Sequence, residues 1–341
     1  MNPTKLRSLG RCGVELPQLG FGCASIGGLF RHVGEEATQA TLQAAWAAGI
    51  RYFDTSPWYG LGRSEEQLGL FLASRPRDEF VVSTKVGRYL TPPDDPEHFD
   101  LGGWVGGNKL QHHFDYTYDG IMRSYEDSLE RLRLGRVDLL LIHDLDMEHF
   151  QTSEGVAARM RQLTDSGWKA LSELKSSGAI RGIGAGVNEM GVIPRMLDAV
   201  PVDFFLVAMP YTILDQDVLD SEFPRCEQNN VGIVLGAVFS SGITATGTVK
   251  DAKYNYQEPP PEIVEKVNKM EAVCAEYRVL LAALALQFPL AHPLVASVIP
   301  GAFQPEQVTR NIENFTRPIP PALWGALKNR GLLRQDAPVP R

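Results

Sequence analysis

Four polar side chains with complementary proton chemistry follow apolar, strand-like runs in the first half of the chain. They are the carboxylate of Asp54, the phenol of Tyr59, the ammonium of Lys85 and the imidazole of His143. A phenol titrates at about pH 10, so it exchanges protons poorly at neutral pH unless a neighbouring ammonium lowers its pKa. A carboxylate would fix that ammonium in place, and an imidazole could orient a substrate oxygen. These residue types predict acid–base chemistry on a carbonyl or alcohol, with a redox cofactor to carry the hydride.

Each of these residues has a more ordinary explanation when it is taken alone. An aspartate or histidine at a strand end is often structural, a lysine there usually extends to water, and a loop tyrosine usually packs. The prediction rests on their arrangement, because consecutive barrel strands bring their carboxyl ends to the same rim. Side chains from three such strands would therefore converge.

The pattern of elements predicts an α/β chain folded as a (β/α)8 TIM barrel. Near-continuous apolar strands alternate with helices about eight times, which is typical of a parallel sheet covered on both faces. The expected strands are 19–23, 50–54, 80–85, 137–143, 180–185, 204–208, 232–238 and 295–299. A doubly wound sheet is the alternative, but residues 20–25 lack the third glycine of the dinucleotide fingerprint.

Helices are expected between these strands, and one domain is expected over residues 1–341. The helical segments are 35–49, 64–73, 118–134, 166–177, 190–199, 216–229, 261–277, 280–288 and a last helix from 305. Ser64 to Gln67 matches a capping box at the start of the second helix. Residues 6–17 predict an N-terminal β-hairpin under the barrel, and residues 86–118 a long loop after the third strand that covers the substrate.

Composition narrows the choice of partners and compartment. The net charge of −8 over 341 residues argues against nucleic acid, whose phosphates need a basic face. The four cysteines form no Cys-x-x-Cys pair, which favours a reduced, cytoplasmic protein. The most apolar run, 279–299, is interrupted by Gln287 and His292, so no membrane span is expected. A monomer and a homodimer are both compatible with the sequence.

The residues around the four polar side chains resemble the aldo-keto reductases. The likeness is carried by Phe53-Asp54-Thr55, Tyr59-Gly60, Ser64-Glu65, Leu68-Gly69 and the strands ending at Lys85 and His143. The catalytic tetrad of that family is Asp, Tyr, Lys and His in this order. The resemblance implies a TIM barrel that binds a nicotinamide cofactor without a Rossmann domain, and it implies that Tyr59 is the general acid/base.

Three further stretches resemble the aldose 1-dehydrogenase branch of that family. They are residues 56–62, 114–120 and 141–146. The branch includes L-fucose and D-threo-aldose dehydrogenases and pyridoxal 4-dehydrogenase. It implies oxidation of a free aldose at the anomeric carbon to the lactone, with pyridoxal 4-dehydrogenase activity as the alternative. Substrate contacts are expected from Trp58, Trp104 and His113.

The cofactor-binding residues match the family pattern less closely. Asn188 stands one position from the Ser-Asn pair that usually holds the carboxamide, and Phe239 stands where an aromatic ring stacks on the nicotinamide. The expected set is Gly22, Asn188, Phe239, Ser240, Gly242, Gly301, Gln307, Arg310 and Asn311. Residues 301–303 carry no basic side chain, and Arg310 is the only nearby cation. A 2′-phosphate wants Arg or Lys, so NAD is favoured over NADP.

Three other functions compete with this interpretation. Metal-ligand residue types gather at His143, Asp144, Asp146, Glu148 and His149, and at His112, His113 and Asp115. No His-x-His follows the first strand, so a metal-dependent hydrolase is disfavoured and no metal is expected. A glycosidase needs two facing carboxylates, which residues 239–241 do not offer. A non-catalytic, cofactor-binding sensor or accessory barrel stays open, although the complete tetrad counts against it.

Overall fold

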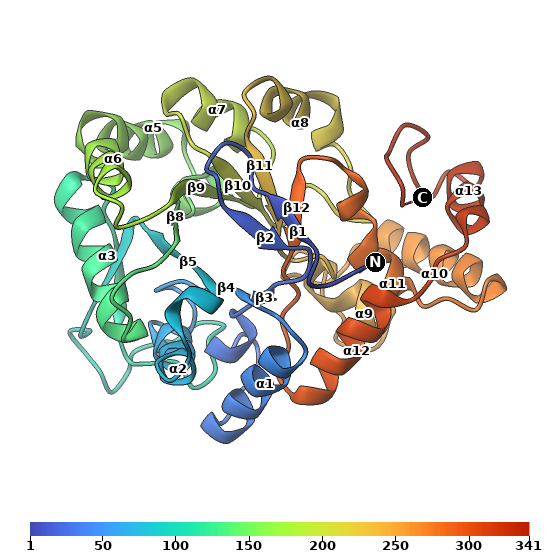
Figure 1. The fold of residues 1–341 in the computed structure, drawn as a ribbon, viewed down its shortest axis with the longest axis horizontal. Coiled ribbons are helices and arrows are strands. Elements are labelled where there is room, and N and C mark those ends of the chain that lie inside the picture. Colours follow the sequence, from blue (N-terminus) through green and yellow to red (C-terminus); the bar gives the residue numbers. More distant parts are fainter. Residues whose placement is uncertain (341) are drawn as a thin grey trace.

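The computed structural model describes residues 1–340, and its centre is a parallel barrel of eight strands (Figure 1). In pairing order they are β3 (Phe21–Gly22), β4 (Tyr52–Asp54), β5 (Val81–Val86), β8 (Leu139–Ile142), β9 (Gly182–Val187), β10 (Phe204–Val207), β11 (Gly232–Leu235) and β12 (Val295–Val298). The two ends of this order meet where Gly20 N donates to Val298 O over 2.9 Å. The predicted TIM barrel is thereby confirmed.

Helices surround the barrel and separate its strands along the chain (Figure 1). They are α1 (Glu35–Ala47), α2 (Arg63–Leu72), α3 (Tyr118–Leu132), α4 (Met147–Phe150), α5 (Ser153–Gln162), α6 (Trp168–Ser176), α7 (Val192–Ala199), α8 (Val218–Gln228), α9 (Ile243–Thr246), α10 (Pro261–Glu276), α11 (Leu281–Gln287), α12 (Pro305–Thr316) and α13 (Pro321–Asn329). Strands β8 and β10 are apolar and buried at every position. Helices on the outside and side chains on the inside explain this uniform burial.

The predicted N-terminal hairpin covers the amino-terminal end of the barrel. Its strands β1 (Leu6–Ser8) and β2 (Glu15–Pro17) pair antiparallel. Leu9 and Leu16 are fully buried and pack on side chains of the barrel interior. Gly10 has φ of +49°, and a Cβ there would lie 2.3 Å from the nitrogen of Gly232. The turn therefore requires glycine, and the chemistry is left to the opposite end of the barrel.

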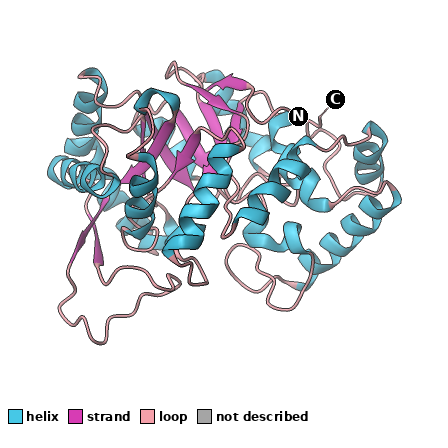
Figure 2. Ribbon diagram, turned by 60° about the horizontal axis from the view of Figure 1, so that its bottom comes forward, coloured by secondary structure: helices cyan, strands magenta, loops and turns pink. Residues whose placement is uncertain are grey.

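The connection after β5 is more ordered than the sequence indicates. It contains a second hairpin, with β6 (Arg88–Thr91) antiparallel to β7 (Gln111–Phe114). Figure 2 shows this two-stranded ladder reaching away from the barrel, with a long loop between its strands. Trp104 in that loop is buried and packs with Leu61 and Leu90. The loop thus folds back onto the rim, as a substrate-covering segment would.

The capping box expected at Ser64 is wrong. Helix α2 begins one residue earlier, after Gly62, whose φ is +92° and which makes no side-chain cap. The Ser64 hydroxyl instead donates to Cys23 O over 2.9 Å and lies 2.9 Å from the Thr55 hydroxyl. Ser64 therefore ties α2 to the ends of two barrel strands.

Helical structure after β8 also begins earlier than expected. The segment expected at 166–177 is preceded by α4 and α5, and a π-helical turn, η3 (Leu163–Gly167), joins α5 to α6. Asp146 and Thr152 cap α4 and α5 by accepting backbone hydrogen bonds. Only the later half of this helical stretch was predicted.

Buried carboxylates also fix strands at the amino-terminal end of the barrel. Just before β8, Asp138 accepts hydrogen bonds from Val82 N over 2.8 Å and from Arg77 over 2.6 Å. Just before β10, Asp203 accepts from Ile183 N over 2.9 Å and pairs with Lys175 over 2.6 Å. These pairs lie at the end opposite to the predicted chemistry, so they serve the fold.

The last described helix, α13, lies on the outside of the barrel, where it contacts α10 (Figure 1). Among residues 1–340, no single helix has both the length and the apolar character of a membrane span. The one combination that reaches that length and composition is α10 with residues 281–291, and it is bent by 100°.

Candidate active site

A buried ion pair joins the ends of β4 and β5. The Lys85 ammonium donates to Asp54 Oδ2 over 2.7 Å and to Thr55 O over 2.8 Å. Ser83 donates its hydroxyl to Asp54 Oδ1 over 2.7 Å. Asp54 and Lys85 are both 2% exposed. Because each charge has a partner and further hydrogen bonds, the ammonium is held in one place at the rim.

Tyr59 lies in the loop after β4, between Lys85 and His143. The Lys85 nitrogen is 4.5 Å from the centroid of the Tyr59 ring, so the ammonium faces the ring. The ring centroids of Tyr59 and His143 are 6.1 Å apart, and the ring centroids of Tyr59 and Trp104 are 5.7 Å apart. The structure thus brings together the four predicted catalytic side chains.

The electrostatics of Tyr59 differ from the expectation. Burial raises its pKa well above the usual value, and the nearby carboxylates of Asp54 and Asp144 raise it further. The pKa is therefore not lowered as expected: burial and the carboxylates outweigh any effect of the Lys85 ammonium, which is paired with Asp54. At neutral pH the phenol is therefore protonated and can donate a proton or a hydrogen bond.

His143 ends β8 and is held on both sides of its ring. Its Nδ1 lies 3.1 Å from the Ser56 hydroxyl, and its Nε2 lies 3.3 Å from Asp144 Oδ2. Burial lowers the pKa of His143 well below its usual value; Asp144 opposes this, and Arg88 and Lys85 add to it. The imidazole is therefore neutral, which suits a hydrogen-bond donor to a substrate oxygen.

A second buried ion pair, between Arg88 and Asp144, lies beside His143. The Arg88 guanidinium contacts the Asp144 carboxylate and stands between two rings, 4.6 Å from the centroid of Trp58 and 4.3 Å from that of Phe114. Burial opposes the charge of Asp144, but His143 and Arg88 hold its pKa well below the usual value. The sequence indicated Asp144 only as a possible metal ligand and gave no signal for Arg88, which the tertiary fold alone brings there.

Asp144, Asp146 and His149 lie close enough to be considered as metal ligands. Their donor atoms are all within 4.8 Å of one another. However, the Asp144 carboxylate is already paired with Arg88, and Asp146 Oδ1 lies 2.7 Å from His149 Nδ1. A cation would have to compete with a buried guanidinium, so this group is better described as a salt-bridge network.

A cavity of about 250 Å³ opens at the carboxyl ends of the strands and holds the four candidate catalytic side chains. Five of the predicted cofactor residues line it: Gly22, Asn188, Phe239, Gly242 and Gly301. Ligand pockets usually span about 300–1,000 Å³, so a whole dinucleotide would extend beyond it over the rim. A ring face at Phe239, an amide at Asn188 and small residues elsewhere fit the flat, amide-bearing nicotinamide.

The other predicted cofactor residues do not line this cavity. The Ser240 side chain is buried and donates to the Thr212 hydroxyl over 3.3 Å, while Ser241 faces the cavity instead. Gln307 accepts from Phe303 N over 2.7 Å, and Asn311 donates to Gly301 O over 3.4 Å. These two residues shape the loop after β12.

Among the residues that the structure describes, two cations lie near the loop after β12. Arg310 is exposed on α12. Arg31, which the sequence did not single out, places its guanidinium 5.2 Å from the centroid of the Phe303 ring. Arg31 comes from the loop after β3, and only the closure of the barrel brings the two loops together.

The predicted substrate residues are divided between two places. Trp58 and Trp104 meet edge to face with ring centroids 5.8 Å apart, next to Tyr59. His112 is 4.5 Å from Trp58, whereas His113 stacks on Tyr89 at 5.1 Å. Neighbouring residues of a strand point to opposite faces, so the structure does not bring His113 into this aromatic group and places His112 there instead.

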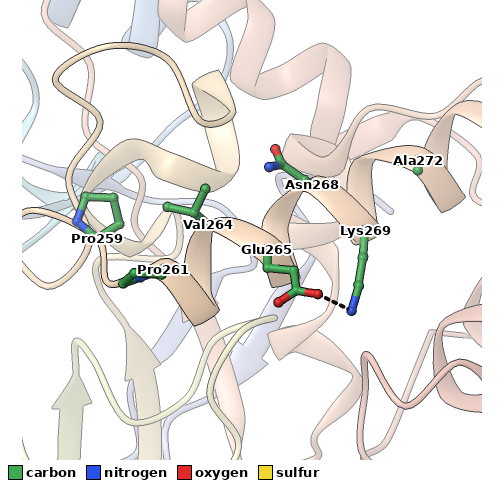
Figure 3. Close-up of a pocket in the computed structure, with 7 residues that line it drawn as sticks. All are labelled: Pro259, Pro261, Val264, Glu265, Asn268, Lys269 and Ala272. Atoms are coloured by element: carbon green, nitrogen blue, oxygen red, sulfur yellow. Dashed lines mark ion pairs between the residues drawn. The ribbon is translucent and has the colours of Figure 1, made fainter.

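Another hollow lies on α10 and the segment before it (Figure 3). It is lined by Pro259, Pro261, Val264, Glu265, Asn268, Lys269 and Ala272. Lys269 pairs with Glu265 over 2.6 Å, one helical turn apart. None of these residues lines the strand-end cavity. The hollow is therefore separate from the candidate active site.

Comparison with known proteins defines the class of this barrel. Residues 18–329 match the model of the Aldo/keto reductase family, whose members are oxidoreductases that use NAD(P)H. The chain is 39% identical to a pyridoxal 4-dehydrogenase of Microbacterium luteolum, an alignment covering 98% of this chain and 99% of that protein. It is 38% identical to a D-threo-aldose 1-dehydrogenase of a Pseudomonas species, covering 94% and 96%.

A solved aldo-keto reductase of Bacillus halodurans superposes with a TM-score of 0.73 and covers 99% of this chain and 98% of that one. Its 24% identity supports the fold alone. The family model and the two relatives carry the assignment. The chain belongs to the aldo-keto reductase family.

Proposed function

We propose that this protein oxidises a free aldose at the anomeric carbon to the lactone, with NAD as the hydride acceptor. The observation that carries the proposal is the position of Tyr59 in the strand-end cavity, between the Lys85 ammonium and the neutral His143. The relative that acts on D-threo-aldoses, at 38% identity over 94% of this chain, supports the choice of substrate.

The reaction assigns a separate task to each side chain. The proton of the anomeric hydroxyl passes to the Tyr59 oxygen, and the hydrogen on the anomeric carbon leaves as a hydride. The carbon–oxygen bond thereby becomes the lactone carbonyl. When bound, the nicotinamide ring supplies the hydride acceptor. Lys85, fixed by Asp54, stabilises the phenolate, and His143 donates a hydrogen bond that orients the substrate oxygen.

The raised pKa of Tyr59 gives the reaction a pH dependence. Oxidation needs the phenolate as base, and burial favours the neutral phenol. We therefore expect the oxidation rate to rise with pH through the alkaline range. Reduction of a carbonyl uses the neutral phenol as acid, so it should be favoured at lower pH.

The preference for NAD rests on the loop after β12. Residues 301–303 are Gly, Ala and Phe, so this loop has no basic side chain there to bind the 2′-phosphate of NADP. Within residues 1–340, Arg31 and Arg310 are cations near this loop. If NADP were instead the better cofactor, Arg31→Ala should weaken its binding more than that of NAD.

Pyridoxal 4-dehydrogenase activity is the second candidate, because the relative with that name is 39% identical over 98% of this chain. The aromatic group of Trp58, Tyr59 and Trp104 beside the cavity would suit a planar pyridine ring. A cofactor-binding sensor without turnover is the alternative from another class.

The four cysteines are unpaired, which supports a reducing, cytoplasmic setting.

The test is the growth of reduced-nicotinamide absorbance with purified protein. NAD and NADP are each combined with L-fucose, D-arabinose, L-galactose and pyridoxal, at neutral and alkaline pH. Turnover of at least one aldose, faster with NAD, is the expected result. Turnover of pyridoxal alone would replace the proposal with the second candidate. Cofactor binding without turnover of any compound would favour the sensor.

A further inference from the structure

The Arg88–Asp144 pair is unusual because it is fully buried and contributes neither a proton nor a packed apolar surface to the tetrad. Arg88 is 2% exposed and Asp144 is 4% exposed. Removing two charges from water costs several kcal/mol per ion, and the mutual attraction only partly offsets it. The Arg88–Asp144 pair lies beside the His143 ring. We therefore ask whether this pair holds His143 in place.

Asp144 is itself held in one orientation. Its backbone has φ of +48°, in the left-handed region that aspartate adopts more readily than most residues. The buried Tyr116 hydroxyl donates to His143 O over 2.6 Å and contacts Asp144 O at 3.2 Å. Arg88 pairs with Oδ2, and Asn188 donates to Oδ1 over 3.1 Å. The carboxylate is therefore a fixed acceptor facing the His143 ring.

This nearby carboxylate favours hydrogen on one of the two ring nitrogens of His143. A carboxylate only accepts hydrogen bonds, so Asp144 Oδ2 at 3.3 Å favours hydrogen on Nε2. Nδ1 then accepts from the Ser56 hydroxyl at 3.1 Å, and the same hydroxyl oxygen accepts from Trp58 N over 3.1 Å. The Ser56 hydroxyl could also accept from Nδ1–H, so the charge of Asp144 is what distinguishes the two tautomers. The 3.3 Å contact is not an aligned hydrogen bond, so Asp144 acts through its negative charge and the Nε2 hydrogen stays available to a substrate oxygen.

We infer that Asp144, clamped by Arg88 and Asn188, is a positioning residue that fixes His143 in the neutral Nε2–H tautomer for the proposed oxidation. The inference rests on the proposed function for its kinetic consequence, but not for the tautomer. Loss of a partner that fixes a histidine tautomer typically costs about 10–100-fold in activity at metal sites, and more in a catalytic triad.

The test variant is Asp144→Asn, which keeps the size of the side chain and removes its charge. An amide can donate as well as accept, so the Nδ1–H tautomer of His143 becomes accessible. Because this change leaves Arg88 buried without a counter-charge, the double variant Arg88→Met/Asp144→Asn is made as well. Methionine is flexible enough to fill the space between the rings of Trp58 and Phe114.

The matched control is Asp138→Asn, at the opposite end of β8. Asp138 is also a buried carboxylate paired with an arginine, Arg77, at 2.6 Å. It lies far along the strand from His143, so its loss should lower stability and leave the active site intact. This control separates a positioning effect from general destabilisation.

The tautomer is read from the ¹⁵N shifts of the histidine ring nitrogens, with the His143 signals assigned by their loss in His143→Gln. We expect Nε2–H alone in the wild type and in Asp138→Asn, and a populated Nδ1–H form in both Asp144 variants. We further expect kcat to fall at least 10-fold in those variants, while KM and the Kd for NAD change less than about threefold.

Three results would overturn the inference: Nδ1–H in the wild type, an unchanged tautomer in folded Asp144 variants, or a kcat loss below 10-fold or matched by Asp138→Asn. The spectra need no substrate. If the wild type oxidises none of the compounds tested, the proposed function fails, and the tautomer still decides whether Asp144 positions His143.

Discussion

The Lys85 ammonium at the strand ends contacts both the Asp54 carboxylate and the ring of Tyr59. Lys85 bonds to Asp54 at 2.7 Å and faces the Tyr59 ring at 4.5 Å. Burial and the Asp54 carboxylate still raise the pKa of Tyr59, so the ammonium matters most once the phenolate forms and needs a positive neighbour. The proton chemistry depends on this balance more than on any single side chain.

Lys85→Met should expose Tyr59 to the uncompensated charge of Asp54. The pKa of the phenol would rise further, so oxidation should slow by about 10²–10⁴-fold and its pH profile should move to higher pH. The measurement is kcat against pH. Lys175→Met, which breaks the pair with Asp203 at the other end of the barrel, is the control and should keep the wild-type profile. An unchanged profile in Lys85→Met would remove Lys85 from the mechanism.

The convergence of the four strand-end side chains in one cavity follows from the sequence, because each of them stands at or just after the end of a predicted barrel strand; their catalytic roles stay a prediction. The sequence is less reliable where the outcome depends on one position along the backbone. Ser241 faces the cavity instead of Ser240, and His112 replaces His113. Arg88 was missed because its partner lies 56 positions away and is joined to it only by the fold.

At the scale of elements, Glu65 joins three of them behind the active site. It lies in the first turn of α2 and is fully buried. Thr84 of β5 donates to its Oε1 over 2.5 Å, and Arg131 of α3 donates to its Oε2 over 2.6 Å. The next residue after Thr84 is Lys85, so this contact also holds the strand that carries the ammonium.

Glu65→Ala should lower the free energy of unfolding by about 3 kcal/mol, because it leaves the mostly buried Arg131 without its carboxylate. The measurement is urea denaturation, with Glu126→Ala on the exposed side of α3 as the control, for which little change is expected. A loss for Glu65→Ala no larger than that of the control would show that this ion pair does not stabilise the packing of α2 and α3.

Helices and strands can be predicted from the sequence where the apolar periodicity is strong. They are predicted less well where a side chain bonds to a partner that is distant in the sequence. The eight barrel strands and most helices are recoverable because of this periodicity. The capping box fails because the Ser64 hydroxyl bonds to Cys23 O and Thr55 instead of its own helix. The β6–β7 hairpin was missed because its strands are polar and separated by a long loop.

At the scale of the whole molecule, the N-terminal hairpin closes one end of the barrel and the candidate active-site cavity lies at the other end. Residues that stabilise the fold and residues that could do chemistry therefore lie at opposite ends.

The fold also buries histidines whose imidazole rings are neutral. Burial lowers the pKa of His292 to about 4, and His292 lies 4.9 Å from the ring of Phe223. Burial, together with Arg88 and other neighbouring charges, lowers the pKa of His112 to about 4.

These histidines predict a loss of stability in acid. A group whose pKa is lowered in the fold binds fewer protons there than in the unfolded chain. Stability is therefore full above about pH 6.5 and falls as the pH drops from there toward about 4. At pH 5, about 1.5 units below the unfolded value, His292 should account for about 2 kcal/mol.

His292→Asn, which cannot take up this proton, should lose less stability than the wild type between pH 7.5 and pH 5. The measurement is the free energy of unfolding at both pH values. The reference is the wild type, measured in parallel at the same two pH values. Equal losses in His292→Asn and the wild type would show that His292 does not set the acid limit.

The most direct test of the account is the oxidation rate of Tyr59→Phe set beside its affinity for NAD, measured by quenching of tryptophan fluorescence. The change removes one hydroxyl and keeps the ring that packs on Trp104. We predict a loss of turnover of at least about 10²-fold with a Kd within about threefold of the wild type. Turnover close to that of the wild type would contradict the assignment of Tyr59 as the general acid/base.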